Sequence, residues 1–485
     1  MDRGRKILVL VAAFALAGCQ SVTLREPVTV RSAQPAESVF EPARLGVPTA
    51  LAGDAPPELT LAEALARAGI ANPTIARADE AVRAGEAQLL QACALLLPTA
   101  NGGANVRFHQ GALISAGGFI RDVNIQSVYV GGGAGAKAAE TVPIPGLRVY
   151  SHLGDAIFAP QAAQQVVVSR EFDAVTVRNR TLLEVGTAYL ALVLAQAERN
   201  ALLRTDEDLS EVVRLTVNQA KAGQGKDSDA QRARTEGLLL KAQIQQSDEN
   251  VAVAAAELAR LLDMDPSAPL RPADAVPPLI ELVDPATPLP ELLQAAVTRH
   301  PELAARNAEV AAAMVHLRQE RVRPWLPVLS AGASLGNFGG TGSLSPDRSW
   351  FASGRLDFDV SATWTVQNLA VGNRALQREA RAVVGEAAAE RNRIGDLIRE
   401  EVTEAYGLVL SRRQEIDLAR QRIDVASKAF KEDMLRAKNL EGRPIELLQS
   451  VALLRDARLA LVNAIAEYSQ AQLRLWVALG NTPRD

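Results

Sequence analysis

Hydrophobic residues recur along this chain at alternating intervals of three and four positions. This 3.5-residue period is typical of helices that pack side by side as coiled coils. The positions that follow it are Leu240, Ile244, Val251, Ala254, Leu258, Leu261, Val402, Ala405, Val409, Ile416, Ala419, Ile423, Ala426, Phe430, Val451, Leu454, Leu461, Ile465, Tyr468, Leu475 and Leu479. Arg412, Arg458 and Gln472 interrupt the pattern. Together with flanking prolines and glycines it predicts helices over 60–97, 161–222, 227–262, 288–323, 370–437 and 444–479.

Two windows, 98–160 and 324–366, have a different character. Together they hold 17 of the 33 glycines and 11 of the 19 aromatic residues, but only 12 charged residues. Segments 105–109 and 356–360 alternate between polar and apolar residues, as a strand with one wet face does. Each window has room for two strands and a loop, and we expect the loops near 117–135 and 338–347.

The chain is an internal duplication of one unit. Asn72-Pro73 corresponds to His300-Pro301 at an offset of 228 residues, whereas Asp229 corresponds to Glu446 at an offset of 217. The first copy is therefore longer by about a dozen residues in its middle, where insertions in exposed loops are tolerated. We expect the longer loop near 117–135 to hold them.

The N-terminus reads as a bacterial export signal. Arg3, Arg5 and Lys6 precede the apolar run 7–17, which is too short to span a bilayer. The sequence Leu-Ala-Gly-Cys ending at Cys19 resembles the bacterial lipobox, which implies a signal peptide 1–18, cleavage before Cys19 and acylation of its thiol. The alternative is an ordinary signal peptide with a chance cysteine. The proline-rich segment 19–58 is expected to be an extended, lipidated arm. The sequence after the signal peptide has no second long apolar run, so we expect no transmembrane helix.

Composition narrows the function classes. A net charge of −4 lacks the basic field that nucleic-acid binding needs, and two cysteines exclude a disulfide scaffold. The four histidines have no ligand spacing, and neither a G-x-S-x-G elbow nor an H-E-x-x-H pair is present. We therefore expect that the protein is not an enzyme and that it has no metal site and no cofactor, apart from a covalent lipid on Cys19.

From about residue 59 onward the chain resembles the TolC-type outer membrane factors. The resemblance rests on the duplicated helix–strands–long helix–short helix order and on Ala222-Gly223 with Asp229, followed by Arg232-Ala233 and Glu236. In the second copy 441–448 stands at the matching place. Two departures are Lys226, where the family usually has a small hydroxyl residue, and a second-copy glycine two residues later than expected.

The resemblance implies a mainly α fold with a small β part. A duplicated long-helix unit would form a periplasmic α-barrel, and four strands per chain would join a shared trimeric outer-membrane β-barrel. The copies would be repeat 1, 59–266, with strands at 98–160 and a tip at 220–229, and repeat 2, 288–483, with strands at 324–366 and a tip at 436–446. A proline-rich linker, 267–287, would join them.

The implied function is the outer-membrane exit duct of a tripartite efflux pump. A lipid-anchored homotrimer would conduct substrates passively from a periplasmic adaptor and an inner-membrane transporter to the exterior, in contact with outer-membrane lipid and with no nucleic acid. The outlet of a type I protein secretion system is one alternative. A non-pore, lipid-anchored periplasmic coiled-coil protein is another. The sequence does not identify the cargo.

The two tips are the predicted functional sites. Adaptor contacts are expected from Gly223, Gly225, Asp227, Asp229, Gly442 and Arg443. Asp433, Glu441 and Glu446 are candidates for a periplasmic gate, because three copies of an acidic residue form a ring that favours cations. The alternatives are that the glycines serve only the turns, and that the acidic residues that open a helix stabilise its N-terminus.

Overall fold

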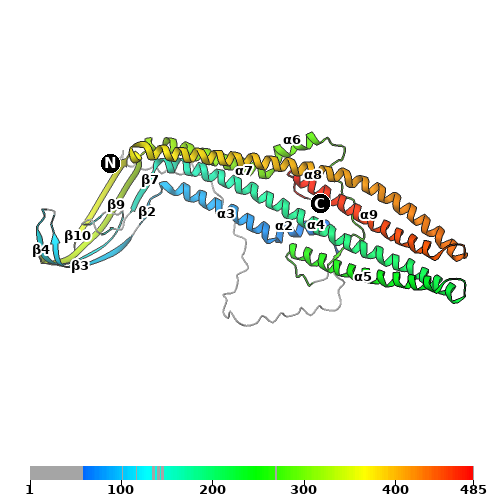
Figure 1. Cartoon of the computed structure of the whole chain (residues 1–485). Coiled ribbons are helices and arrows are strands. Elements are labelled where there is room, and N and C mark those ends of the chain that lie inside the picture. The colour runs from blue at the N-terminus through cyan, green and yellow to red at the C-terminus, as the bar shows by residue number, and fades with distance from the viewer. Residues whose placement is uncertain are drawn as a thin grey trace. The chain divides into compact units, whose positions relative to one another are not determined.

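The computed structural model describes residues 58–100, 102–115, 117–133, 137–138, 142–143, 147–267, 270–343 and 345–483 (Figure 1). The predicted signal peptide 1–18, Cys19 and the arm as far as residue 57 lie outside these residues. The described chain forms two compact units. One contains 82–169 and 306–390 and carries the main sheet; the other contains 58–81, 170–305 and 391–483 and is almost entirely helical.

Helices make up most of the described chain, so the predicted mainly α fold with a small β part is confirmed. The helices are α2 (Leu61–Ala71), α3 (Pro73–Cys93), α4 (Leu153–Lys221), α5 (Asp227–Leu261), α6 (Leu289–Arg299), α7 (Pro301–Val322), α8 (Val371–Lys438) and α9 (Pro444–Ala478), with short 3₁₀ turns η1 (Ala94–Leu96), η2 (Arg323–Trp325) and η3 (Gln367–Ala370). The N-terminus of α2 is fixed by a capping box between Thr60 and Glu63.

Three helix boundaries differ from the prediction. The helices expected over 60–97 and 288–323 are each split in two, at Asn72 and His300, which have extended backbones with ψ of 123°. Both precede a proline, whose ring disfavours helical geometry in the residue before it. The long helix α4 begins at Leu153 rather than near 161, so Pro160 lies inside the helix, where its missing amide removes one backbone hydrogen bond.

The six strands of the main sheet lie along four side-by-side paths, which we call strand lines; two of these lines contain two strands each. Its strands are β2 (Thr99–Ala100), β3 (Gly102–Ile114), β4 (Ile120–Gly133), β7 (Leu147–His152), β9 (Val328–Gly342) and β10 (Ser345–Thr363). β2 pairs with β7 and β3 with β4, both β7 and β4 pair with β9, and β9 pairs with β10, all antiparallel. β2 with β3 thus form one line, β7 with β4 the next, and β9 and β10 the third and fourth.

The additional residues of the first copy fall within the second strand line. Gly133 of β4 lies opposite Ser334 of β9, and Leu147 of β7 lies opposite Ala333, the next position. Residues 134–146, with the short pair β5 (Lys137–Ala138) and β6 (Val142–Pro143), therefore separate two strands that keep one register. The expectation of a long loop near 117–135 is wrong: a tight hairpin closes there, with the Ser115 amide donating to the Phe119 carbonyl at 3.0 Å.

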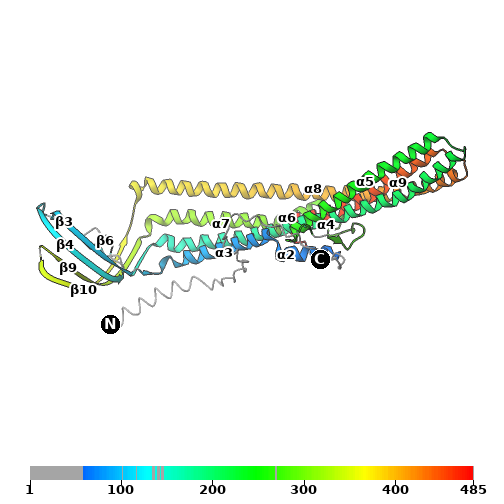
Figure 2. The same cartoon turned by 90° about the horizontal axis from the view of Figure 1, so that it is seen from below.

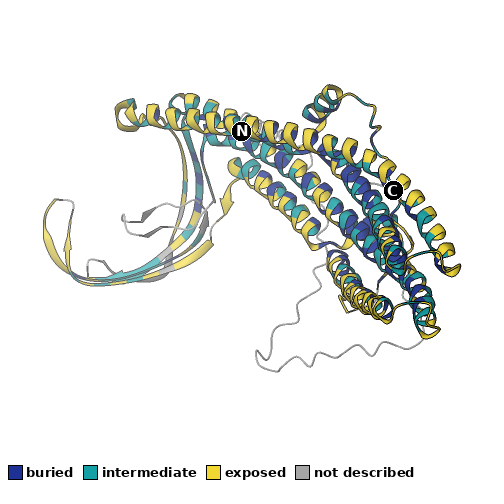
Figure 3. Ribbon diagram, turned by 45° about the vertical axis from the view of Figure 1, so that its right-hand side comes forward, coloured by how far each residue is buried: buried dark blue, intermediate teal, exposed yellow. Residues whose placement is uncertain are grey.

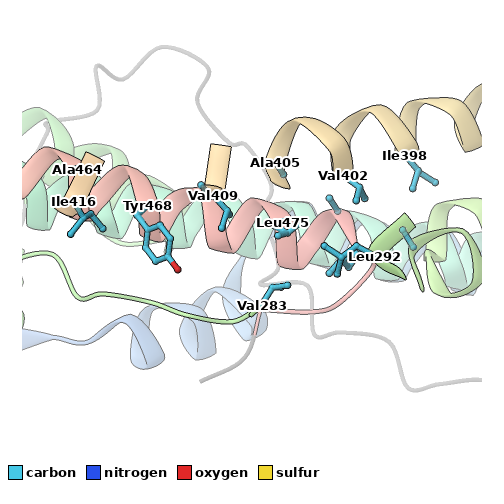
Figure 4. Close-up of a cluster of buried hydrophobic side chains, with 14 of the residues drawn as sticks. Val283, Leu292, Ile398, Val402, Ala405, Val409, Ile416, Ala464, Tyr468 and Leu475 are labelled. Atoms are coloured by element: carbon cyan, nitrogen blue, oxygen red, sulfur yellow. The ribbon is translucent and has the colours of Figure 1, made fainter. Parts of the chain in front are cut away.

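The predicted coiled-coil positions form the core of the helical unit. Val402, Val409 and Ile416 of α8 and Tyr468 and Leu475 of α9 are at most 1% exposed and pack in one cluster (Figure 4). A second cluster joins α2, α4 and the end of α5. Figure 3 shows these buried stripes along helices whose other faces are exposed. Alanines supply many of the buried positions, which lets neighbouring helices approach closely.

The segment predicted as a proline-rich linker is strapped to the helices. The side-chain amide of Gln472, fully buried on α9, accepts from the Val283 amide at 2.9 Å and donates to the Val283 carbonyl at 3.1 Å. Ser469 donates to the carbonyl of Pro278 at 2.6 Å. Near its start, Tyr189 of α4 donates to Asp274 at 2.7 Å. The parallel pair β1 (Glu58–Leu59) and β8 (Arg271–Pro272) ties it to the start of the described chain.

Candidate functional site

The hairpin between α4 and α5 is built around a glycine turn. The amides of Gln224 and Gly225 both donate to the carbonyl of Gln219, at 2.9 and 3.1 Å. Gly223 has a φ of 74°, in the left-handed region where a side chain is strained. These bonds satisfy one of the carbonyl groups that the last turn of a helix leaves unpaired.

The hairpin between α8 and α9 repeats the same backbone 217 residues later. The amides of Glu441 and Gly442 donate to the carbonyl of Arg436 at 2.9 and 3.2 Å. Leu440 stands where the first hairpin has Gly223, and it keeps the left-handed conformation with a φ of 65°. The second-copy glycine is therefore not a displaced Gly223.

Gly225 and Gly442 are the glycines that the two hairpins share. A Cβ on Gly225 would lie 3.4 Å from the amide nitrogen of Ala220, and one on Gly442 would lie 3.2 Å from that of Ala437. Both positions face the last turn of the preceding helix closely. Their role in the structure is to let the chain pass near that helix end.

Asp433 is engaged within its own hairpin. Its Oδ2 accepts a hydrogen bond from the hydroxyl of Ser450 on α9, and its Oδ1 lies 3.9 Å from Nη1 of Arg436. Only 23% of the Asp433 side chain is exposed. The carboxylate therefore links α8 to α9.

Glu441 and Glu446 occupy different environments. Glu441 is exposed in the turn itself. Glu446 is the third residue of α9, and its carboxylate accepts from the backbone amide of Arg443 at 3.4 Å. This contact is one half of a capping box, so Glu446 has a structural function at the helix start. Arg443 itself is exposed.

Asp227 and Asp229 are the first and third residues of α5. Asp227 is exposed, whereas Asp229 is partly buried and lies 3.5 Å from Arg232. Both carboxylates are near the positive end of the helix dipole, where negative charge is favourable. Both aspartates therefore lie where the alternative interpretation places them, at a helix N-terminus that they stabilise. Asp227 is also accessible to a partner.

The two hairpins pack against each other. Val212 of α4, Leu240 of α5 and Leu447 of α9 are among the buried residues of a shared apolar cluster. The side-chain amide nitrogen of Gln219 donates to the carbonyl of Ala437 at 2.7 Å. Lys438 lies 3.6 Å from Glu211, whose pKa is lowered chiefly by a hydrogen bond from Arg214 and also by Lys438. Side chains thus hold the two turns together.

A groove lies between α5 and α9 beside these turns. Its volume is about 660 Å³, and it is lined by Arg232, Glu236, Ile445, Leu448 and Arg455 among others. The lining combines charged side chains with exposed apolar ones, and Ile445 is 42% exposed. Such a surface suits an amphipathic helix.

The sheet has one apolar and one polar face. On the apolar face Leu335 of β9 lies opposite Leu356 of β10, and Phe358 and Val360 follow on the same side, each between 65% and 77% exposed. The alternate positions carry Asp357 and Asp359. An apolar face this exposed needs a nonaqueous neighbour.

A cavity of about 250 Å³ lies where the end of α9 meets the start of α7. His300 lines it, is 7% exposed, and its Nδ1 has no hydrogen-bond partner. Burial, and then the charge of Arg180, lower the pKa of His300 to about 4. Burial raises the pKa of Glu401 in the same cavity. Sequence reasoning assigned His300 no role.

The first copy has Asn72 in place of His300. The Asn72 side chain donates to the Leu261 carbonyl at 2.8 Å and accepts from the Thr74 amide at 2.8 Å. The oxygen of Asn72 thus caps α3, and its NH2 group ties this helix start to the last residue of α5. No bond of this kind is made by Nδ1 of His300 in the second copy. The sequence signal that would have singled out His300 is its difference from Asn72, which stands at the same position of the first copy.

Two further properties concern the described residues as a group. None of their helices is long and apolar enough to cross a membrane. No three histidine, cysteine, aspartate or glutamate side chains in the described ranges come together as a metal site requires.

Solved structures share this fold. The outer-membrane channel OprN has a TM-score of 0.72 and 20% identity over 87% of this chain and 90% of its own. The CmeC outer membrane channel of Campylobacter jejuni has a TM-score of 0.70 and 16% identity over 87% of this chain and 85% of its own. The outer membrane protein VceC of Vibrio cholerae has a TM-score of 0.69 and 15% identity over 87% and 96%.

The fold is therefore that of outer-membrane channels. Within that class it is the fold of the TolC-type outer membrane factors, as the duplicated pattern predicts. The likeness is one of structure: no protein-family model and no curated protein matches the sequence.

Proposed function

We propose that the chain is an outer-membrane exit duct, a passive conduit of an efflux pump. The observation that carries this proposal is the two-faced sheet: one face is apolar and exposed, and the other is polar. The same chain also contains long helices that pack in pairs. An apolar sheet face in contact with lipid and a polar face toward water is the arrangement of a transmembrane β-barrel. A passive conduit needs no catalytic group, and we assign none.

A trimer is the assembly we propose. Within the described sheet, β3 pairs on one side only, with β4, and β10 pairs on one side only, with β9. Backbone groups at an open edge are not tolerated in hydrocarbon, so four strand lines must join those of other copies. Exposed leucines and valines on two helices also suit contact with other copies: Leu238 and Val253 of α5 are 68% and 60% exposed, and Leu418 and Val425 of α8 are 63% and 65% exposed.

The hairpin turns are the proposed periplasmic end. Gly223, Gly225, Asp227, Asp229, Gly442 and Arg443 would lie at or near the adaptor contact, and the groove between α5 and α9 would receive a helix of the adaptor. An inner-membrane transporter would supply the energy. The same groove would serve a type I secretion system, so this alternative shares the site.

Bilayer recording tests the duct. The purified full-length protein is expected to run as a trimer that dissociates on heating and to insert into planar bilayers as discrete conductance steps. Trimers that never conduct would favour the lipid-anchored coiled-coil alternative. Monomers that stay in the aqueous phase would contradict the duct and the trimer together.

Lipidation of Cys19 is a separate proposal, based on the lipobox alone. Cells fed labelled palmitate are expected to label the natural protein and not Cys19→Ala, because the acylated thiol is lost. The same signal is expected to persist in Cys93→Ala, the matched control. Label that still enters Cys19→Ala would exclude this cysteine as the acylation site.

A further inference from the structure

The cavity beside His300 has the form of a small-molecule site. Its volume is about 250 Å³, and its lining comes from α4, α8, α9 and the start of α7, all within the helical unit. Figure 2 shows α4, α8 and α9 running alongside one another. Leu183, Leu408 and Val477 supply apolar surface. Apolar walls with a few convergent polar groups are typical of sites that bind small ligands.

His300 presents an unsatisfied nitrogen to this cavity. The residue is 7% exposed, and its Nδ1 has no hydrogen-bond partner among the described residues. Burial, and then the charge of Arg180, lower the pKa of His300 to about 4, so the ring is neutral at pH 7 and one of its nitrogens can accept a hydrogen bond. A buried polar atom without a partner is costly, and a bound molecule that donates to it removes this cost.

Two polar residues of the cavity differ from their counterparts in the first copy. Asn72 stands at the position of His300, and Thr187 stands at the position of Glu404, 217 residues earlier. The same helical unit therefore forms with an asparagine and a threonine at these places. Folding alone does not explain why a histidine and a glutamate meet at one cavity in the second copy.

The charged side chains at the opening of the cavity leave an excess of negative charge. Arg180 is already paired with Glu302 at 2.7 Å. Glu401, Glu404 and Arg474 also line the cavity, are exposed, and make no ion pair with another described residue. Two carboxylates against one guanidinium favour a ligand with a single positive charge.

The chemistry of the lining indicates an organic cation. No three histidine, cysteine, aspartate or glutamate side chains of the described chain come together as a metal site requires. The polar groups that lack partners are mainly acceptors, namely carboxylate oxygens and an imidazole nitrogen, and N–H groups match them. Apolar walls are best covered by an apolar body, which is removed from water at the same time.

We propose that this cavity binds a small protonated amine with a compact apolar body. The ammonium group donates to the carboxylates of Glu401 and Glu404 and to Nδ1 of His300, and the apolar body lies against Leu408 and Val477. This inference goes beyond the proposed function. It gives the helical unit a ligand site that is distinct from the two tips, whether or not the chain conducts.

Equilibrium dialysis with labelled phenethylamine tests the site. The purified full-length protein is dialysed at neutral pH, with protein-free detergent as the blank for uptake into micelles. We expect saturable binding of one amine per chain, with a dissociation constant in the low millimolar range. Phenylacetate and phenethyl alcohol carry the same ring with a negative charge or no charge, and each is expected to bind about tenfold more weakly.

Two variants place the residues of the first copy in the cavity. Glu404→Thr and His300→Asn are each expected to weaken amine binding about fivefold. The first loses a carboxylate, and the second uses its oxygen at the start of α7, as Asn72 does at the start of α3. Glu404→Gln takes the place of Glu404→Thr if that variant does not fold. Glu400→Thr and His316→Asn are the matched controls, since both residues are exposed and lie outside the lining.

Four outcomes would overturn the proposal. Amine binding that is equal in all variants would place the amine elsewhere, and a loss shared by Glu400→Thr would indicate a general effect of surface charge. Tighter binding of phenylacetate would make the cavity an anion site at Arg474. The absence of saturable binding by either probe would mean that the cavity holds only water. None of these outcomes bears on the duct, which bilayer recording tests separately.

Discussion

Polar residues that interrupt the hydrophobic pattern turn out to have specific partners. Arg412 pairs with Glu415 at 2.6 Å and with Glu467 at 3.0 Å. Arg458 pairs with Asp208 at 2.8 Å. The interruptions were visible in the sequence, but their partners were not, because ion pairs between helices depend on which faces meet.

His300 provides a prediction at the residue scale. Its pKa is about 4 in the folded chain and about 6.5 when unfolded, so between these values only the unfolded chain binds the proton. The contribution of neutral His300 to the free energy of unfolding is therefore fully present above pH 6.5. It is lost as the pH falls toward 4, by an amount on the order of 1–3 kcal/mol. Urea unfolding between pH 7 and 4.5 is expected to show this loss.

His300→Asn is expected to abolish that part of the pH dependence, since asparagine does not titrate. At neutral pH it should add about 1 kcal/mol if it caps α7 as Asn72 caps α3. Subtracting the two pH profiles separates the titration of His300 from that of the carboxyl groups of Glu401 and Glu404, which line the same cavity with Arg180 and Arg474. The exposed His316→Asn is the control. Parallel curves for the natural protein and His300→Asn would contradict the assignment.

The left-handed leucine gives a second prediction. Leu440→Gly is expected to raise the melting temperature, because relief of about 1 kcal/mol of backbone strain exceeds the added entropy of the unfolded chain. Gly223→Ala should lower stability by about the same amount. Leu435→Ala, at an exposed helical site, controls for loss of an apolar side chain. A lower melting temperature for Leu440→Gly would mean that the leucine side chain stabilises the hairpin.

At the scale of elements, the 3.5-residue period predicted the helices and the buried faces of α5, α8 and α9. It did not predict the splits at Asn72 and His300, because the helical pattern continues across each proline. Alternation predicted the strands, but the additional residues of the first copy were placed wrongly. Their position depends on the register of β4 and β7 against β9, which only the pairing reveals.

The strap over α9 can be tested through Gln472. Gln472→Leu keeps the side-chain size but leaves the amides of Leu282 and Val283 and the carbonyl of Val283 without partners. We expect a loss of about 2–4 kcal/mol and faster hydrogen exchange at both amides. Gln449→Leu, on an exposed face of α9, is the control. Protected amides in Gln472→Leu would show that other contacts hold the strap.

At the scale of the whole molecule, the sequence predicted the fold, and the structure adds the contacts that the tip residues make. Asp433, Glu441 and Glu446 all stay gate candidates: Glu441 is exposed, Asp433 accepts a hydrogen bond from Ser450, and Glu446 accepts one at the start of α9. Sequence spacing places a carboxylate near a turn, but its freedom depends on the donor that packs beside it.

If Glu441 forms an acidic ring at the gate, Glu441→Gln is expected to lower the preference for cations, because a trimer then loses three negative charges at its mouth. Reversal potentials in a KCl gradient are expected to move toward zero by about a third or more. Glu432→Gln, an exposed change earlier on α8, and Asp433→Asn should each have a smaller effect. If Asp433→Asn alone changes selectivity, the ring lies at Asp433 after all.

The shared backbone of the two hairpins has a consequence for symmetry. A trimer of this duplicated chain would present six turns of one shape, alternating between a Gly223 type and a Leu440 type. A ring of six identical partner subunits could then meet three chains without a mismatch in number, provided that each subunit accepts either residue. The difference between glycine and leucine would divide such a ring into two classes of three, and a partner sensitive to it would occupy only one class.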